Sequence, residues 1–176
     1  MFKPLMAAAA ALLTAAAAHA APDLVIVVRH AERAAEPSGD PSLSPAGRQR
    51  AVQLAEVLGD GRITAIITTP LRRTQETAEP LAKALGLTPQ VVGFRKGEFA
   101  AHVPEVVAAL GRMTGNVLVV GHSNTVNAIV ATLSGVVQPQ LCETSYGHVF
   151  VVTPATKAVI RLRYGDVDPT PGAGCQ

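Results

Sequence analysis

The sequence contains no tryptophan, and aromatic residues make up only 3% of its 176 residues. Surfaces that bind nucleic acids usually combine clustered basic charge with aromatic side chains on which bases stack. Here 15 lysines and arginines stand against 13 aspartates and glutamates, so the formal net charge is only +2. The composition therefore predicts no nucleic-acid partner, and any positive charge that matters for function must be local.

Cysteine is also scarce, with only Cys142 and Cys175 in the chain. Their spacing fits neither a CxxC redox pair nor a zinc site. We predict a disulfide between them, which would attach a Pro/Gly-rich tail from about residue 166 to the domain; two unpaired thiols are the alternative. Carboxylates and histidines also lack metal-ligand spacing, so we expect no metal and no other cofactor.

Long apolar runs are restricted to the N-terminus. Lys3 precedes an alanine-rich run over residues 5–18, and Ala18-His19-Ala20 fits a small-x-small cleavage pattern. We predict a secretory signal peptide over residues 1–20 and a mature domain over residues 21–176, with no membrane span after cleavage; an uncleaved anchor is the alternative. A periplasmic or secreted location would favour the disulfide.

Strand-like and helix-like segments alternate through the rest of the sequence. Apolar runs rich in β-branched residues, typical of strands buried on both faces, occur at residues 24–28, 63–69 and 116–120. Helices are predicted over residues 44–58, 70–85, 104–112 and 123–134. Pro80 is expected to kink or split the second helix, and Pro104 to begin the third. A short strand is predicted at 91–92 and a β-hairpin over 148–164. The alternation of strands and helices along the chain predicts one three-layer α/β/α sandwich with a mainly parallel sheet.

Three polar clusters follow predicted strands, and the carboxyl ends of parallel strands meet at one edge of a sheet. They are Arg29-His30, residues 69–73, and Gly121-His122-Ser123-Asn124. The guanidinium group of arginine matches the geometry of phosphate oxygens. Imidazole can act as a nucleophile or as an acid-base group, and the N-terminus of a helix favours anions. Gly121 would let the backbone approach a ligand closely. The conjunction predicts a phosphoryl-transfer site.

The same clusters resemble the motifs of a known family. Val28-Arg29-His30-Ala31-Glu32 is similar to the RHG motif of the histidine phosphatase superfamily, also called phosphoglycerate mutase-like, with alanine in place of glycine. Residues 69–78 (TPLRRTQETA) resemble its S-x-L-x-R-[AT]-x-x-T-A segment, residues 119–123 its second histidine motif, and residues 42–47 its pLtxxG helix start. The resemblance covers about residues 24–135, and it is closest to small exported members.

The resemblance implies a role for each matching residue. His30 would be the nucleophile and become phosphohistidine, and Arg29 and Arg73 would hold the phosphoryl oxygens. His122 would stabilise the transition state, and Ser123 follows it in the substrate-binding motif. The family's chemistry would then be a metal-independent hydrolysis of a phosphomonoester, with two arginines helping to keep His30 neutral.

The family's acidic proton donor lies in an insertion that is very short here, residues 91–103. Glu98 is the one carboxylate in this stretch and is our candidate for the proton donor. His102 is a weaker candidate for the same role. Glu32 lies close to His30, but it could equally cap or brace the loop that follows the first strand. The short lid implies a broad or large substrate, such as a phosphosugar, a phosphorylated envelope glycan or a phosphoprotein.

Several functional alternatives remain open at this stage. They are a phosphohistidine-protein phosphatase, a mutase, a non-catalytic binder of phosphate or anionic glycans, and an inert α/β envelope protein.

Overall fold

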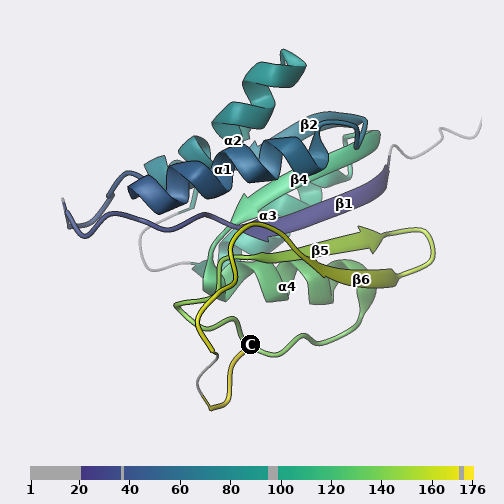
Figure 1. The fold of residues 1–176 in the computed structure, drawn as a ribbon. Helices are drawn as coiled ribbons and strands as arrows, with labels where there is room; N and C mark the ends of the chain where they lie inside the picture. Colours follow the sequence, from purple (N-terminus) through teal and green to yellow (C-terminus); the bar gives the residue numbers. More distant parts are fainter. Residues whose placement is uncertain (1–20, 37, 95–98, 171–172) are drawn as a thin grey trace, which may run out of the picture.

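The structure, a computed structural model, describes residues 21–36, 38–94, 99–170 and 173–176. The predicted signal peptide lies outside these residues. Within them the chain forms six strands and four helices (Figure 1). In chain order the elements are β1 (Pro22–Arg29), α1 (Pro45–Leu58), β2 (Ile63–Thr68), α2 (Arg72–Leu85), β3 (Gln90–Val91), α3 (Phe99–Leu110), β4 (Gly115–Gly121), α4 (Ser123–Ser134), β5 (His148–Thr153) and β6 (Ala158–Arg163).

The strands form one sheet in the order β3-β2-β4-β1-β5-β6. β1 and β2 both pair in parallel with β4, and β3 pairs in parallel with β2. β5 runs antiparallel to β1, and β6 runs antiparallel to β5, as the closing hairpin requires. The α/β architecture with a mainly parallel sheet is therefore as predicted.

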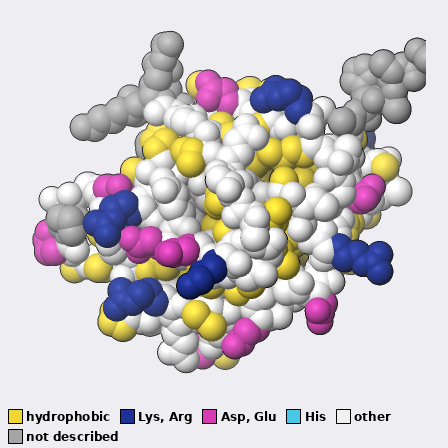
Figure 2. Space-filling model, turned by 90° about the horizontal axis from the view of Figure 1, so that it is seen from above, with side chains coloured by type: hydrophobic (Ala, Val, Ile, Leu, Met, Phe, Trp, Pro, Cys, Tyr) yellow, Lys and Arg dark blue, Asp and Glu magenta, His cyan; other side chains and the backbone are white. Residues whose placement is uncertain are grey.

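Each face of the sheet is covered by two helices, which gives the three layers. In β1 the side chains alternate: Val25 and Val27 pack with buried residues of α3 and α4, whereas Ile26 and Val28 pack with buried residues of α1 and α2. This alternation explains why β1 reads as a continuous apolar run, since both of its faces are in a core. Figure 2 views the α1–α2 side, where acidic and basic side chains are mixed and form no patch of a single sign.

The start of α1 is fixed by its sequence. The Ser44 hydroxyl accepts a hydrogen bond from the backbone N–H of Gly47 (3.1 Å), and Pro45 is the first helical residue. A Cβ on Gly47 would collide with the carbonyl oxygen of Glu32. Glycine therefore lets α1 pack directly against the segment that follows the end of β1.

Two prolines lie inside helices. A split of α2 at Pro80, one of the two predicted effects, does not occur: the helix continues through the proline as one element, because Ala78, Leu81 and Ala82 on both sides of it are buried. Helix α3 does not begin at Pro104 but at Phe99, since its buried face already includes His102 and Val103. In both helices burial outweighs the loss of one backbone hydrogen bond, a penalty of about 3 kcal/mol in a helix interior.

The C-terminal tail is attached to the loop between α4 and β5. Cys142 and Cys175 form the predicted disulfide, with 5.1 Å between their Cα atoms. The backbone N–H of Cys142 donates to the carbonyl of Gln176 (2.9 Å), and the N–H of Gln176 donates to the carbonyl of Gln140 (2.8 Å). Among the described residues, no helix combines the length and the apolar character that crossing a membrane requires.

Candidate active site

A cavity of about 440 Å³ opens at the carboxyl edge of the sheet, beyond the ends of β1 and β4. All three polar clusters contribute to it. The residues that line it are Arg29, His30, Arg33, Gly39, Pro41, Arg73, His122, Ser123, Asn124, Gln140 and Glu143. A larger hollow of about 550 Å³ runs along α2 and its C-terminal loop, but neither His30 nor His122 lines it. The cavity at the strand ends is therefore the candidate active site.

The contacts of His30 fix its ring and its tautomer. Its Nδ1 lies 2.7 Å from the carbonyl oxygen of Ala31, and because a carbonyl only accepts, Nδ1 carries the hydrogen. The other nitrogen, Nε2, lies 3.2 Å from Nε of Arg73, which donates to it. The backbone N–H of His30 donates to the Gly121 carbonyl (2.9 Å), which holds the residue at the sheet edge. Nε2 is thus the nitrogen with a free electron pair directed at a cationic group.

Both histidines of the cavity are held in the neutral form. Burial lowers the pKa of His30 to about 3, and the charges of Arg29 and Arg73 add to this effect. Burial also lowers the pKa of His122 to about 3, helped by its proximity to His30 and Arg73. The ring centroids of His30 and His122 lie 5.3 Å apart in an edge arrangement. At neutral pH the pair therefore offers unprotonated imidazole, which is the form a nucleophile needs.

Threonines of the second cluster orient His122. The Thr69 hydroxyl lies 3.1 Å from Nε2 of His122 and 2.9 Å from the Thr74 hydroxyl. The backbone N–H of His122 donates to the Thr125 hydroxyl (3.0 Å) at the start of α4. These hydrogen bonds and the capping box that His122 forms with Thr125 fix the orientation of the ring at the edge of the cavity.

Arg73 is carried by the first turn of α2. Its side chain is 16% exposed, and its Nη1 lies 3.7 Å from the carboxylate of Asp40, which belongs to the loop after β1. The Thr77 hydroxyl donates to the Arg73 carbonyl (2.6 Å) and accepts from the backbone N–H of Ala31 (2.9 Å). One threonine thereby links the residue after His30 to the helix that carries Arg73.

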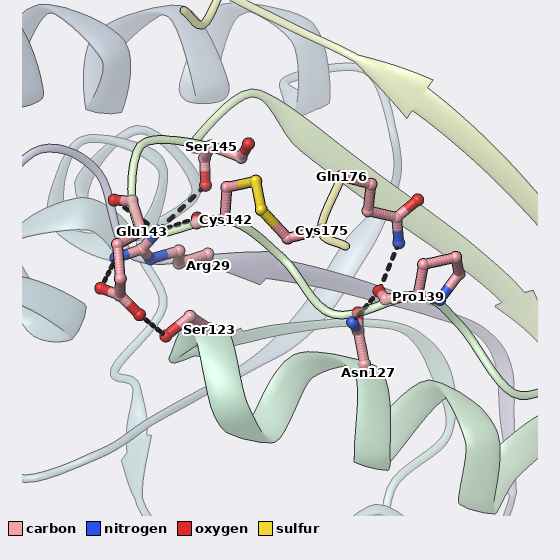
Figure 3. Close-up of a disulfide and its surroundings, with 9 residues drawn as sticks. All are labelled: Arg29, Ser123, Asn127, Pro139, Cys142, Glu143, Ser145, Cys175 and Gln176. Atoms are coloured by element: carbon pink, nitrogen blue, oxygen red, sulfur yellow. Dashed lines mark hydrogen bonds and ion pairs between the residues drawn. A yellow bond between two sulfur atoms is a disulfide. The ribbon is translucent and has the colours of Figure 1, made fainter. Parts of the chain in front are cut away.

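Arg29 is bound very differently from Arg73. Its side chain is only 2% exposed, and its Nη1 donates to the carbonyls of Cys142 (2.8 Å), Glu143 (2.9 Å) and Ser145 (3.2 Å), as Figure 3 shows. The guanidinium also stacks on the Tyr146 ring at 4.3 Å. Most of its donors are thus taken by the loop before β5, and its Nη2 edge faces Glu143.

Glu143 is a cavity residue that no sequence motif revealed. Its carboxylate accepts from Nη2 of Arg29 (2.8 Å) and from the hydroxyl of Ser123 (2.6 Å), the first residue of α4 (Figure 3). These hydrogen bonds, from Ser123 first and then from Arg29, lower the pKa of Glu143. A negative group therefore sits where donors from β1 and α4 converge, which is an anion-binding position.

The other sequence candidates fall elsewhere. Glu98 lies outside the described residues. His102 is buried beside Phe94, with its Nδ1 3.3 Å from the Gly93 carbonyl, and does not line the cavity. Glu32 braces the fold instead: its carboxylate pairs with Nε and Nη2 of Arg50, at 2.8 Å each.

Close packing gives Gly121 a structural role. A Cβ at this position would lie 2.9 Å from the Thr125 hydroxyl. Glycine therefore lets α4 pack closely on the end of β4.

The described part of the chain contains no group of three or more histidine, cysteine, aspartate or glutamate side chains that could hold a metal ion. The positive charges among the described residues that line the cavity are those of Arg29, Arg33 and Arg73. Guanidinium groups can bind and orient an oxyanion in the way that a metal cation would.

The pKa values of the two histidines lead to a prediction for nuclear magnetic resonance. The imidazole signals of His30 and His122 should titrate near pH 3 rather than near pH 6.5. Since the unfolded chain binds these protons near pH 6.5 and the folded one near pH 3, the free energy of unfolding should fall as the pH drops from about 6.5 towards 3. Titration of both signals near pH 6.5 would show that the rings are not desolvated.

Replacing Glu143 by glutamine should tighten the binding of inorganic phosphate about two- to fivefold, because it removes a like charge whose effect is screened by solvent. Isothermal calorimetry would measure the change, with Glu105→Gln as a control that removes the same charge from an exposed position on α3. Weaker binding in Glu143→Gln would mean that the carboxylate is needed to aim Arg29.

Comparisons with known proteins agree with the sequence motifs and with the fold. The sequence model described as "Histidine phosphatase superfamily (branch 1)" matches residues 25–96. The chain is similar in structure to the protein histidine phosphatase SixA complexed with tungstate, with a TM-score of 0.59 and 19% identity over 80% of this chain and 95% of that one. It is also similar to mycobacterial glucosyl-3-phosphoglycerate phosphatase complexed with VO3, with a TM-score of 0.57 and 19% identity over 74% and 92% of the two chains. No curated protein matched the sequence.

Proposed function

Because the chain belongs to the histidine phosphatase superfamily, we propose that it is a metal-independent phosphomonoester hydrolase in which His30 carries the phosphoryl group. The observation that carries this proposal is the state of His30. Its Nδ1–H is locked on the Ala31 carbonyl, its Nε2 is unprotonated, and Arg73 lies 3.2 Å away to receive the oxyanion.

In the first step Nε2 of His30 attacks phosphorus. The N–P bond forms while the bond from phosphorus to the ester oxygen breaks, and the alcohol leaves with a proton. Arg73 would transfer its Nε–H hydrogen bond from His30 to a phosphoryl oxygen, and His122 and the N-terminus of α4 would stabilise the others. In the second step water attacks phosphorus and gives one proton back to the group that protonated the alcohol, the N–P bond breaks, and inorganic phosphate leaves.

Glu98 remains our proposal for the donor of the leaving-group proton. Glu143 is the carboxylate found on the cavity, but its lowered pKa keeps it ionised at neutral pH. An ionised carboxylate can accept a proton but cannot give one. Glu143 is therefore better suited to interact with donors than to protonate the alcohol.

We propose an exported or envelope-located substrate. The disulfide and the predicted signal peptide support this location, since disulfides persist in oxidising compartments. Phosphosugars, phosphorylated envelope glycans and phosphoproteins are the candidate classes. The likeness to SixA favours a phosphohistidine protein as a second candidate substrate. A non-catalytic binder with the same cavity is the alternative that activity assays must exclude.

A substrate screen with purified exported protein tests the proposal. The panel comprises p-nitrophenyl phosphate, phosphosugars, phosphorylated envelope glycans and a phosphohistidine-containing protein. Turnover of any phosphomonoester supports the hydrolase, and turnover of the phosphohistidine protein alone supports the second candidate. Tight phosphate binding without turnover of any panel member would indicate the non-catalytic binder.

Activity is expected to be unchanged after dialysis against EDTA, because arginines supply the positive charge around the phosphoryl group. The measurement compares initial rates before and after dialysis, and again after divalent cations are restored. A loss that one particular cation reverses would show that the electrostatics of the cavity had been misjudged.

A further inference from the structure

The guanidinium of Arg29 is aimed by backbone atoms from a distant part of the chain. Three carbonyls of residues 142–145 accept from its Nη1, whereas its Nε has no hydrogen-bond partner among the described residues. The direction of its Nη2 edge, which faces the cavity and Glu143, therefore depends on where these carbonyls lie (Figure 3).

Little regular structure holds the segment that carries these carbonyls. Residues 136–147 are all described and form neither helix nor strand. Burial of Leu141, which is 1% exposed, a hydrogen bond from the Asn127 side chain of α4 to the Pro139 carbonyl, and the C-terminal tail fix the segment instead. The tail acts through the disulfide, through backbone hydrogen bonds of Gln176 with Gln140 and Cys142, and through the Gln176 side chain, which donates to the Pro139 carbonyl (2.7 Å). Cys142 is thus both the point of covalent attachment and one of the acceptors of Arg29.

We propose that the Cys142–Cys175 disulfide and the tail that it attaches form a positioning element of the phosphate site. Neither cysteine touches the ligand, and both act by fixing the carbonyls that aim Arg29. The inference rests on the proposed function, because it assumes that Arg29 binds phosphoryl oxygens. It makes phosphate affinity depend on a bond at the far end of the chain.

The experiment measures binding of inorganic phosphate by calorimetry in the full exported protein, oxidised and then reduced. A dithiol reductant transfers two electrons and two protons, which gives two cysteine thiols and the cyclic disulfide of the reagent. Reduction, or the double substitution Cys142→Ser with Cys175→Ser, should weaken phosphate binding roughly 10- to 100-fold, since a displacement of about 1 Å has effects of this size. The KM should rise more than kcat falls, and reoxidation of the reduced protein should restore binding.

Two further variants separate positioning from general destabilisation. Ile63→Val removes one buried methyl group at the start of β2, far from the carboxyl edge, and should leave the phosphate affinity unchanged. Deletion of Gln176 keeps the disulfide but removes the backbone hydrogen bonds and the side-chain contact with Pro139, and should weaken phosphate binding by a smaller factor. This milder variant decides the question if the cysteine variant fails to fold.

A reduced, folded protein with the phosphate affinity of the oxidised one would overturn the inference, and so would an unchanged affinity after deletion of Gln176. The effect of reduction should also vanish in an Arg29→Lys background, because the group being positioned is then gone; an equal effect in that background would overturn the inference as well. Redox-dependent phosphate binding without turnover of any phosphomonoester would contradict the proposed hydrolase but support the positioning role.

Discussion

Replacing His30 by alanine should lower kcat/KM on a phosphomonoester by at least about 10⁴-fold, the scale on which loss of a catalytic nucleophile acts. The contact of its Nδ1 with the Ala31 carbonyl fixes the tautomer of the ring, so that the electron pair of Nε2 faces Arg73. Without it no N–P bond can form. Steady-state kinetics on the best substrate of the panel would measure the loss.

His148→Asn is the matched control for this substitution. His148 is also a buried histidine whose pKa burial lowers, to about 4, but it stacks on Phe150 in β5 and does not line the cavity. His122→Ala should lower turnover about 10²–10³-fold, as expected for loss of one transition-state donor, and should not add to His30→Ala. Near-normal turnover of His30→Ala would exclude it as the nucleophile.

Arg29→Ala should abolish phosphate binding and also reduce the free energy of unfolding, by about 3 kcal/mol, because three backbone carbonyls lose their donor and two of them are buried. Arg73→Ala should lower kcat/KM about 10²–10³-fold but change the free energy of unfolding by less than about 1 kcal/mol, since its ion pair with Asp40 is long and partly exposed.

Urea titrations together with kinetics would distinguish the two arginines. The contrast follows from burial, because Arg29 is 2% exposed and serves as an anchor for residues 142–145, whereas Arg73 is held at the cavity from the first turn of α2. Equal stability of both variants would contradict the anchoring role of Arg29.

The part of the site that could be predicted from sequence is the part that local patterns determine. A strand end fixes where the next side chain lies, and parallel pairing of β1, β2 and β4 then places His30, Arg73 and His122 at one edge. Glu143 and Tyr146 could not be predicted in this way. They lie in a loop without periodic pattern, and they reach Arg29 across more than 110 residues.

Proline shows the same limit of local reasoning within the fold. Pro80 and Pro104 carry a strong local preference against a helix interior, yet both lie within helices. Neighbouring residues on each helix are buried in the cores that cover the two faces of the sheet. Sequence patterns reveal the preference of one residue, but not how much burial its neighbours gain when the helix continues.

Direct capture of the phosphorylated enzyme tests the central claim most directly. Purified protein is mixed with ³²P-labelled substrate and quenched in alkali, since an N–P bond is stable to base and labile to acid. Peptide mapping should then place the label on His30, and His30→Ala should carry none while His122→Ala still becomes labelled. Label on His122, or turnover without any alkali-stable and acid-labile label, would contradict the phosphohistidine mechanism.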